Sequence, residues 1–397
     1  MARSGGLVKR RAVVAGSAIA LVLFGIAARP YVLGLSLVVR AANLQGLARR
    51  AADLYTVAET ERLVRVPVAH TSIRARVYAP LRTSRQTVLL VSGLHPAGID
   101  EPRLMALARE LAKTNVTVVI PEIPELRQFD ITPALTDRIE EAAVWLATES
   151  GMAPTGRIGL MGVSFSGGLS LVAAGRPSLR NHVSYVLSFG GHDDLPRVLR
   201  YLCTGIEAAP GGATAAPYTT APRSPHDYGV AIILLGIADR LVPPDQAAAL
   251  RAGVRRFLWA SALDQVDKPQ AEREFAALRV LARDLPEPSR TLLEYVNNRD
   301  VARLGPRLLP YIAFYGDAPA LSASRSPKPS APVFLLHGRH DNVIPAVESK
   351  YLAARLRGQT SVRLLVTDLI SHADADQPAH IGDVLELAGF WGDLLNR

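Results

Sequence analysis

The sequence of 397 residues predicts an α/β fold with a mostly parallel sheet, helices on both of its faces and a helical cap insertion. Short apolar runs alternate with helical segments in residues 62–191 and again in residues 331–397, as in a parallel sheet covered on both sides. Residues 192–330 lack that alternation and are helical or loop-like, with breaks rich in Pro, Gly and Ala. A sheet whose two parts are separated in the sequence by a helical insertion indicates one α/β domain that carries a cap.

The composition is that of a folded protein, with 49% apolar and 20% charged residues. Lys and Arg number 45 against 36 Asp and Glu, which gives a formal net charge of +9. The arginines are spread along the chain instead of forming a basic block interleaved with aromatic residues. This pattern predicts a solvated basic surface and no nucleic-acid partner. Cys203 is the one cysteine, so no internal disulfide is expected.

The amino terminus, residues 1–40, is expected to be a membrane anchor. Basic residues precede an uncharged run over residues 12–28, which is about as long as the shortest membrane-spanning helices. The alternative is a cleaved signal peptide, with Gly25 and Ala27 as the small residues before the cut, and hence a secreted protein. As an uncleaved anchor, the segment predicts a single-pass membrane protein whose body lies outside the cytoplasm, because the basic residues are on the near side.

The elements of the body follow in order. Residues 41–61 carry leucines at helical spacing and predict a helical connector, and residues 62–69 and 72–79 alternate as the two strands of a hairpin. Further strands are expected at residues 87–91, 116–120, 157–163, 184–189, 332–336 and 361–367, and helices at residues 103–113, 133–148, 346–357 and 380–395.

The stretch from residue 157 to 168 carries the first chemical signal. An apolar strand stops at Ser164 and a helical segment follows, which is the pattern of a nucleophile elbow that lifts a serine hydroxyl clear of the sheet. Gly162 and Ser166 provide the small residues that such a turn needs two positions before and after the serine. Ser166 also has small neighbours two positions away and is an alternative nucleophile. Ser164 is favoured because it directly follows the end of the expected strand at residues 157–163.

A serine hydroxyl needs a base that takes its proton and a third group that orients the base. Asp341 follows the strand at residues 332–336, and His372 follows the strand at residues 361–367. In such sheets the partners belong on loops at the carboxyl ends of strands. Asp193 and Asp194, one strand earlier, are an alternative location for the acid; otherwise they are solvated loop residues or a helix cap.

With the order serine, acid, histidine, the chain resembles the α/β-hydrolase superfamily. The resemblance covers the body from about residue 62 to the carboxyl terminus without the cap, and its most specific stretch is residues 337–345, His-Gly-x-x-Asp-x-x-Ile-Pro. It implies an α/β-hydrolase fold with Ser164 as nucleophile, Asp341 as acid and His372 as general base.

The resemblance also implies an oxyanion hole made of two backbone N–H groups, those of Leu94 and Phe165. Leu94 lies in the loop after the strand at residues 87–91, where the family often has His-Gly and this chain has Ser92-Gly93. In the same loop, His95 is expected to cap a turn; the alternative is that it lines the pocket.

The expected activity is that of a serine hydrolase that cleaves a small-molecule carboxylic ester through an acyl-enzyme. Residues 228–242 of the cap are unusually apolar and either pack the cap on the sheet or receive an apolar acyl group above Ser164. A peptidase or amidase on the same triad, or a catalytically silent membrane-tethered binding module, are the alternatives. No cofactor and no metal are expected, because neither a dinucleotide fingerprint nor a histidine set with zinc spacing is present in the sequence.

Overall fold

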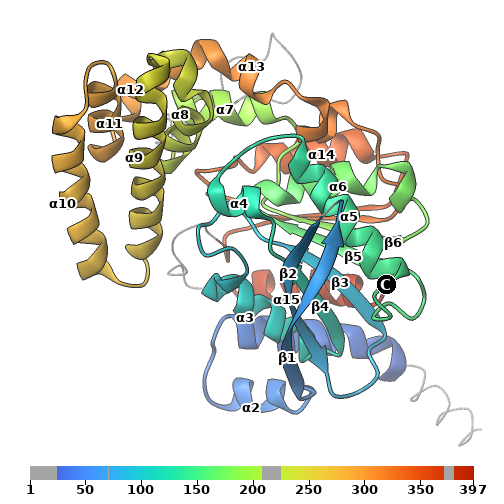
Figure 1. Cartoon of the computed structure of the whole chain (residues 1–397). Helices are drawn as coiled ribbons and strands as arrows, with labels where there is room; N and C mark the ends of the chain where they lie inside the picture. Colours follow the sequence, from blue (N-terminus) through green and yellow to red (C-terminus); the bar gives the residue numbers. More distant parts are fainter. Residues whose placement is uncertain (1–24, 70, 208–224, 371–379) are drawn as a thin grey trace, which may run out of the picture. The chain divides into compact units, whose positions relative to one another are not determined.

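The computed structural model describes residues 25–69, 71–207, 225–370 and 380–397 (Figure 1). The contacts divide the chain into two compact units. One unit consists of residues 1–57 and 379–397, and the other of residues 58–378.

The larger unit is built on one sheet, in which eight strands of the described residues follow the order β1-β2-β4-β3-β5-β6-β7-β8. The strands are β1 (Glu59–Val68), β2 (Thr71–Pro80), β3 (Gln86–Val91), β4 (Val116–Pro121), β5 (Ile158–Val163), β6 (Val183–Phe189), β7 (Val333–Gly338) and β8 (Val362–Thr367). The hairpin β1–β2 and the pair β2–β4 are antiparallel, and all other neighbours are parallel. The predicted, mostly parallel sheet is thereby confirmed.

Helices cover this sheet, and the expected helices are found close to the predicted bounds. The helices of this part are α3 (Pro102–Ala112), α4 (Pro124–Gln128), α5 (Ala134–Thr148), α6 (Phe165–Ala174) and α14 (Val347–Leu356). Short 3-10 helices lie at Gly98–Asp100, Pro177–Leu179, Leu309–Tyr311, Pro319–Leu321 and Ala323–Arg325. Strands β3 and β4 are buried along almost their whole length, as expected for central parallel strands with apolar side chains on both faces.

The described residues of the insertion between β6 and β7 form helices joined by loops and contain no strand (Figure 1). Its helices are α7 (Leu195–Thr204), α8 (Tyr228–Leu241), α9 (Pro244–Leu263), α10 (Lys268–Asp284), α11 (Ser289–Asn297), α12 (Val301–Leu308) and α13 (Ile312–Gly316). Helix α8 is buried on nearly all sides, which explains why its sequence is apolar without a polar face. The side chains of Leu250, Val254 and Phe257 on α9 are also buried.

The smaller unit contains a helix at residues 25–41, α2 (Leu47–Asp53) and α15 (Ile381–Leu395). The prediction of a helical connector over residues 41–61 is wrong in its extent, since only α2 is helical after residue 41 and β1 already begins at Glu59. Asn43 and Gly46 have φ values of 51° and 76°, which interrupt the helical backbone before α2. The C-terminal helix α15, expected with the second part of the sheet, groups with residues 1–57.

The predicted membrane anchor lies mostly outside the described residues, which begin at residue 25. In the part of the chain that the structure describes, no helix combines the length and the apolar character needed to cross a membrane.

Candidate active site

Ser164 occupies the turn between β5 and α6 with φ 56° and ψ −130°. This conformation lies outside the regions that L-residues adopt freely, so it is maintained by its surroundings. The Ser164 N–H donates to the Phe189 carbonyl at 2.6 Å, and the Gly167 N–H donates to the Ser164 carbonyl at 2.8 Å. These bonds tie the turn to the end of the neighbouring strand and to the first turn of α6.

The glycines around the turn are required by close approach. A Cβ on Gly162 would lie 2.5 Å from the Ser170 hydroxyl oxygen and closer still to the Ser166 carbonyl. A Cβ on Gly93 would lie 3.2 Å from the Ser164 Cβ, so the loop after β3 passes directly beside the serine. The absence of side chains at these two positions allows the loop after β3 to lie against the turn of Ser164.

Ser166, the alternative nucleophile, is fully buried within α6, and its hydroxyl donates to the Ser92 carbonyl. This bond connects α6 to the first residue of the loop that carries Leu94. The hydroxyl therefore serves as a link between two backbone segments. Its burial also separates its role from that of Ser164, whose side chain is partly exposed in the turn.

A cavity of about 40 Å³ adjoins Ser164. Its lining brings the turn together with the predicted oxyanion residues Leu94 and Phe165. Phe165 is the first residue of α6, so its N–H has no partner within the helix and lies at the positive end of the helix dipole. The remaining lining residues are apolar apart from the Tyr228 hydroxyl: Ile131, Leu195, Val198, Leu199, Leu202, Tyr228, Gly229, Ile232, Val343 and Ile344.

The loop of Asp341 reaches the same cavity. Asp341 is 3% exposed, and its Oδ1 accepts from the Val343 and Ile344 N–H groups at 2.9 and 3.0 Å. Because these two donors hold one carboxylate oxygen, the orientation of the side chain is defined by its own loop. Val343 and Ile344 also line the cavity beside Ser164. A short loop thus positions the carboxylate and contributes to the wall of the cavity.

His337 holds the loop of Asp341 in place through contacts of both ring nitrogens. Its imidazole is fully buried between the Ser349 hydroxyl, 2.6 Å from Nδ1, and the Ile344 carbonyl, 2.8 Å from Nε2. A carbonyl can only accept, so Nε2 carries the proton. The same Nε2 lies 3.5 Å from Oδ2 of Asp341. His337 therefore has a supporting role that its sequence position beside Asp341 did not reveal.

His372, the predicted base, is in the segment 371–379, outside the described residues. Thr367, the last residue of β8, is paired in the sheet with Gly338, the last residue of β7. The Arg339 N–H donates to the Thr367 carbonyl at 2.9 Å.

Asp193 and Asp194 have structural partners. The Asp194 side chain accepts from the Arg197 N–H and caps the N-terminus of α7, which confirms the helix-cap alternative for this residue. Asp193 is fully buried and forms ion pairs with Arg197 and Arg355 at 3.1 and 2.9 Å. The expectation of a solvated loop is therefore wrong for Asp193, because two guanidinium groups compensate its buried charge.

His192 lies next to the site, which was not expected from the sequence. Its ring stacks on Phe165, with the centroids 5.0 Å apart and an angle of 14° between the planes, and its Nε2 lies 2.8 Å from the Leu321 carbonyl. Burial lowers the pKa of His192, so the imidazole is neutral near pH 7. The preceding Gly190-Gly191 pair was the available signal, since a Cβ on Gly191 would clash with the backbone of Gly167.

His95 does cap its own turn, because its Nδ1 accepts from the Ala97 N–H at 3.2 Å. Burial lowers the pKa of His95 as well. Among the described residues, no three His, Cys, Asp or Glu side chains are grouped as metal ligands.

The strand order, the strained serine turn after β5 and the cap between β6 and β7 define an α/β-hydrolase fold. No family model and no curated protein matches the sequence. Solved structures with a similar course include an esterase from Pyrobaculum calidifontis, with 15% identity over 92% of this chain and 91% of that chain and a TM-score of 0.44.

Two further structures illustrate the range of such proteins. A dienelactone hydrolase from Anabaena variabilis has 16% identity over 84% of this chain and 96% of that chain, with a TM-score of 0.40. An acylaminoacyl peptidase from Pyrococcus horikoshii has 11% identity over 85% of this chain, with a TM-score of 0.41. This chain spans only 41% of the length of that peptidase.

Proposed function

We propose that this protein is a serine hydrolase that cleaves a carboxylic ester through an acyl-enzyme. The observation that carries the proposal is the shared cavity, where the strained Ser164 turn meets Leu94, Phe165 and the loop of Asp341. A serine in a strained turn beside a helix N-terminus, with a positioned carboxylate on an adjacent loop, has the parts that acyl transfer requires.

In the proposed mechanism, the Ser164 hydroxyl attacks the ester carbonyl while His372 takes its proton. Asp341 orients the imidazole and stabilises its charged form, and the N–H groups of Leu94 and Phe165 bind the oxyanion. His372 returns the proton to the leaving alcohol. Water, activated by the same histidine, then releases the acid and restores Ser164.

The substrate is proposed to carry an apolar acyl group. Leu195, Val198, Leu199 and Leu202 of α7 and Tyr228, Gly229 and Ile232 of α8 line the cavity beside Ser164. The apolar segment of the cap therefore contributes to the wall of the cavity as well as to the packing of the cap. An acyl chain against these side chains gains about 0.8 kcal/mol for each buried methylene group.

The test is covalent labelling of the purified protein with a fluorophosphonate probe, followed by hydrolysis of paired small esters and amides. Wild type and Ser166→Ala are expected to be labelled and Ser164→Ala is not, because the Ser166 hydroxyl is buried and bonded to Ser92. Asp341→Asn should lower the rate by several powers of ten without loss of the fold. An unlabelled wild-type protein would favour the silent binding module, and faster cleavage of amides than of matched esters would favour a peptidase or amidase.

We further propose that the uncharged run at residues 12–28 anchors the protein in a membrane, with the body outside the cytoplasm. The basic residues before that run and its length support this. Retention in the membrane fraction after salt and carbonate washes is the expected result. Recovery of a soluble protein that begins near Ala28 would identify the run as a cleaved signal peptide.

A further inference from the structure

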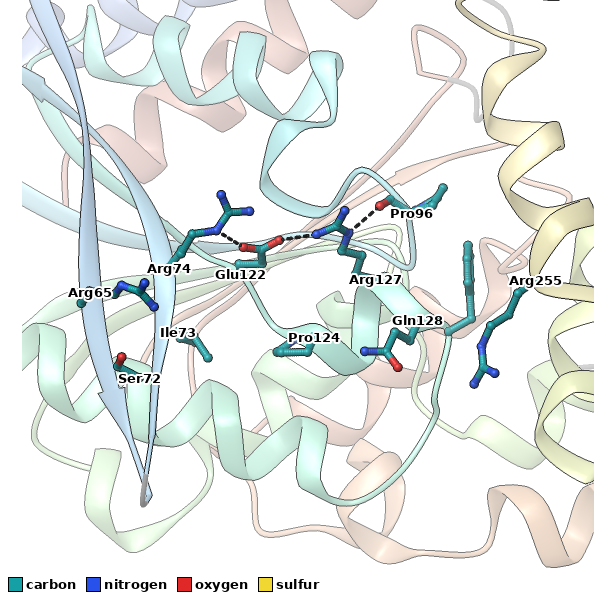
Figure 2. A pocket seen from close by; sticks show the side chains of 11 residues that line it. Arg65, Ser72, Ile73, Arg74, Pro96, Glu122, Pro124, Arg127, Gln128 and Arg255 are labelled. Carbon is teal, nitrogen blue, oxygen red and sulfur yellow. Dashed lines mark hydrogen bonds and ion pairs between the residues drawn. The ribbon is translucent and has the colours of Figure 1, made fainter. Parts of the chain in front are cut away.

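A second, larger cavity of about 670 Å³ lies between the β1–β2 hairpin, the segment around α4 and helix α9 of the cap (Figure 2). Its volume falls within the roughly 300–1,000 Å³ typical of small-molecule sites. Arginines dominate its charged lining: Arg65, Arg74, Arg127 and Arg255. Glu122 is the acidic residue among the lining residues.

Glu122 arranges two of these arginines. Its side chain is 10% exposed and bridges Arg74 Nε at 2.7 Å and Arg127 Nη1 at 3.0 Å, as Figure 2 shows. The Glu122 N–H also donates to the Arg74 carbonyl at 2.8 Å, so this pair is fixed through backbone and side chain. Among the described residues, no acceptor is bonded to Nη1 or Nη2 of Arg74 or to Nη2 of Arg127. These N–H groups remain for a ligand.

Arg65 adds an unfavourable contact that an anion would relieve. It is directly paired with Arg74 across the β1–β2 hairpin, so both side chains project from the same face of the sheet. Like charges directly opposite each other destabilise a hairpin. Within the described chain, no acidic side chain forms an ion pair with Arg65. A bound anion between these guanidinium groups would replace the repulsion by attraction.

The charge balance indicates how many negative charges the ligand carries. The four lining arginines are opposed by Glu122 and by Asp130, which pairs with Arg255 at 3.1 Å, so a net charge of +2 remains. Besides Glu122, Asp100 also raises the pKa of Arg74, but its charge is matched by its ion pair with Arg76. A phosphomonoester carries about −1.5 to −2 near pH 7, and guanidinium groups bind its oxygens in a bidentate manner. Ile73 and Phe129 also line the cavity and offer an apolar wall to an organic substituent.

We propose that this cavity binds an organic phosphomonoester, with the phosphate held by Arg65, Arg74 and Arg127 and the organic part against Ile73 and Phe129. The phosphate belongs either to a soluble metabolite or to the head group of a lipid. Arg127 also donates to the carbonyl of Pro96, at 2.9 Å, in the loop that carries Leu94. The proposal concerns binding alone and does not depend on the hydrolase activity.

The test is calorimetric titration of the full-length protein with phenyl phosphate, and with benzoate as the matched monoanion. Phenyl phosphate is expected to bind, and benzoate at least tenfold more weakly. Arg74→Gln and Arg65→Gln should each weaken binding of phenyl phosphate by about tenfold or more, because each loses charge-assisted hydrogen bonds. Arg65→Gln breaks no hydrogen bond of the described structure and is expected to fold. It therefore tests whether the arginines bind the phosphate even if Arg74→Gln fails to fold. Arg82→Gln, the same charge change at an exposed loop position, should bind like wild type.

Vesicles distinguish the two sources of the phosphate. Co-sedimentation with phosphatidylcholine vesicles that contain phosphatidic acid, lost in Arg65→Gln and kept in Arg82→Gln, would assign a lipid head group even without binding of phenyl phosphate. Binding of phenyl phosphate without such co-sedimentation would assign a soluble ligand. The proposal is overturned if neither probe binds, if benzoate binds as tightly as phenyl phosphate, or if Arg65→Gln and Arg74→Gln bind like wild type.

Discussion

Replacement of Ser164 by glycine should stabilise the protein relative to replacement by alanine. Both variants lose the hydroxyl, so they differ only in whether residue 164 has a Cβ. With φ 56° and ψ −130°, a residue with a Cβ is strained by about 1–3 kcal/mol, and glycine is not. Glycine costs about 0.4–1 kcal/mol in the unfolded chain, so Ser164→Gly should exceed Ser164→Ala in the free energy of unfolding by about 1.3 kcal/mol at the centre of these ranges and by about 2.6 kcal/mol at most.

The assay is urea unfolding followed by far-UV circular dichroism, with Ser166→Gly and Ser166→Ala as the matched pair. Ser166 lies inside α6, where glycine is less stable than alanine by about 1 kcal/mol. The two positions should therefore give differences of opposite sign. A Ser164→Gly protein that is less stable than Ser164→Ala would refute the idea that the turn stores strain.

Buried residues around Ser164 give three further predictions. Glu348→Ala should lower the free energy of unfolding by about 3–5 kcal/mol, because the buried carboxylate accepts from Arg197 and from two backbone N–H groups. Glu140→Ala, which breaks a partly buried ion pair with Arg176, should cost less, about 1 kcal/mol. Burial lowers the pKa of His192 below its usual 6.5, so the contribution of this residue to the free energy of unfolding should be complete above pH 6.5 and should decrease as the pH falls below that value. In urea titrations at several pH values, the free energy of unfolding of His192→Gln should depend less on pH than that of wild type. The kcat/KM for nitrophenyl esters should rise about fourfold for each methylene added to the acyl chain until the cavity is filled. In Ile232→Ala the rise should continue to a longer acyl chain than in wild type, because the lining side chain is smaller. A kcat/KM that falls beyond acetate would contradict the apolar acyl site.

The sheet could be predicted from the sequence because its strands are short apolar runs between clear breaks. β5 was expected at residues 157–163 and is found at Ile158–Val163. Because this strand is buried on both faces, nearly all of its side chains must be apolar, and the sequence pattern shows this directly. The connector before β1 was predicted less well. Its leucines have helical spacing, but the positive φ values of Asn43 and Gly46 depend on local turns that this spacing does not encode.

The residues that support the site were harder to predict. Asp341 could be singled out by its position after a strand and by the motif around it. The roles of His192 and Glu348 arise from contacts with residues more than a hundred positions away in the chain, such as Leu321 and Asp193. A single sequence carries no periodic pattern for such contacts, so isolated buried polar residues cannot be assigned to partners before the fold is known.

The small volume of the cavity at Ser164 has a kinetic consequence. About 40 Å³ is far below the roughly 300–1,000 Å³ of sites that enclose a small molecule, so an ester with a long acyl chain does not fit the described arrangement. On the proposed function, such a substrate needs the lining helices α7 and α8 to lie farther from Ser164 than they do in the described arrangement. The apparent affinity for every long ester is then reduced by the fraction of molecules that are open at a given moment. Short esters escape this reduction, so the chain-length preference measures an opening equilibrium together with the apolar contacts themselves.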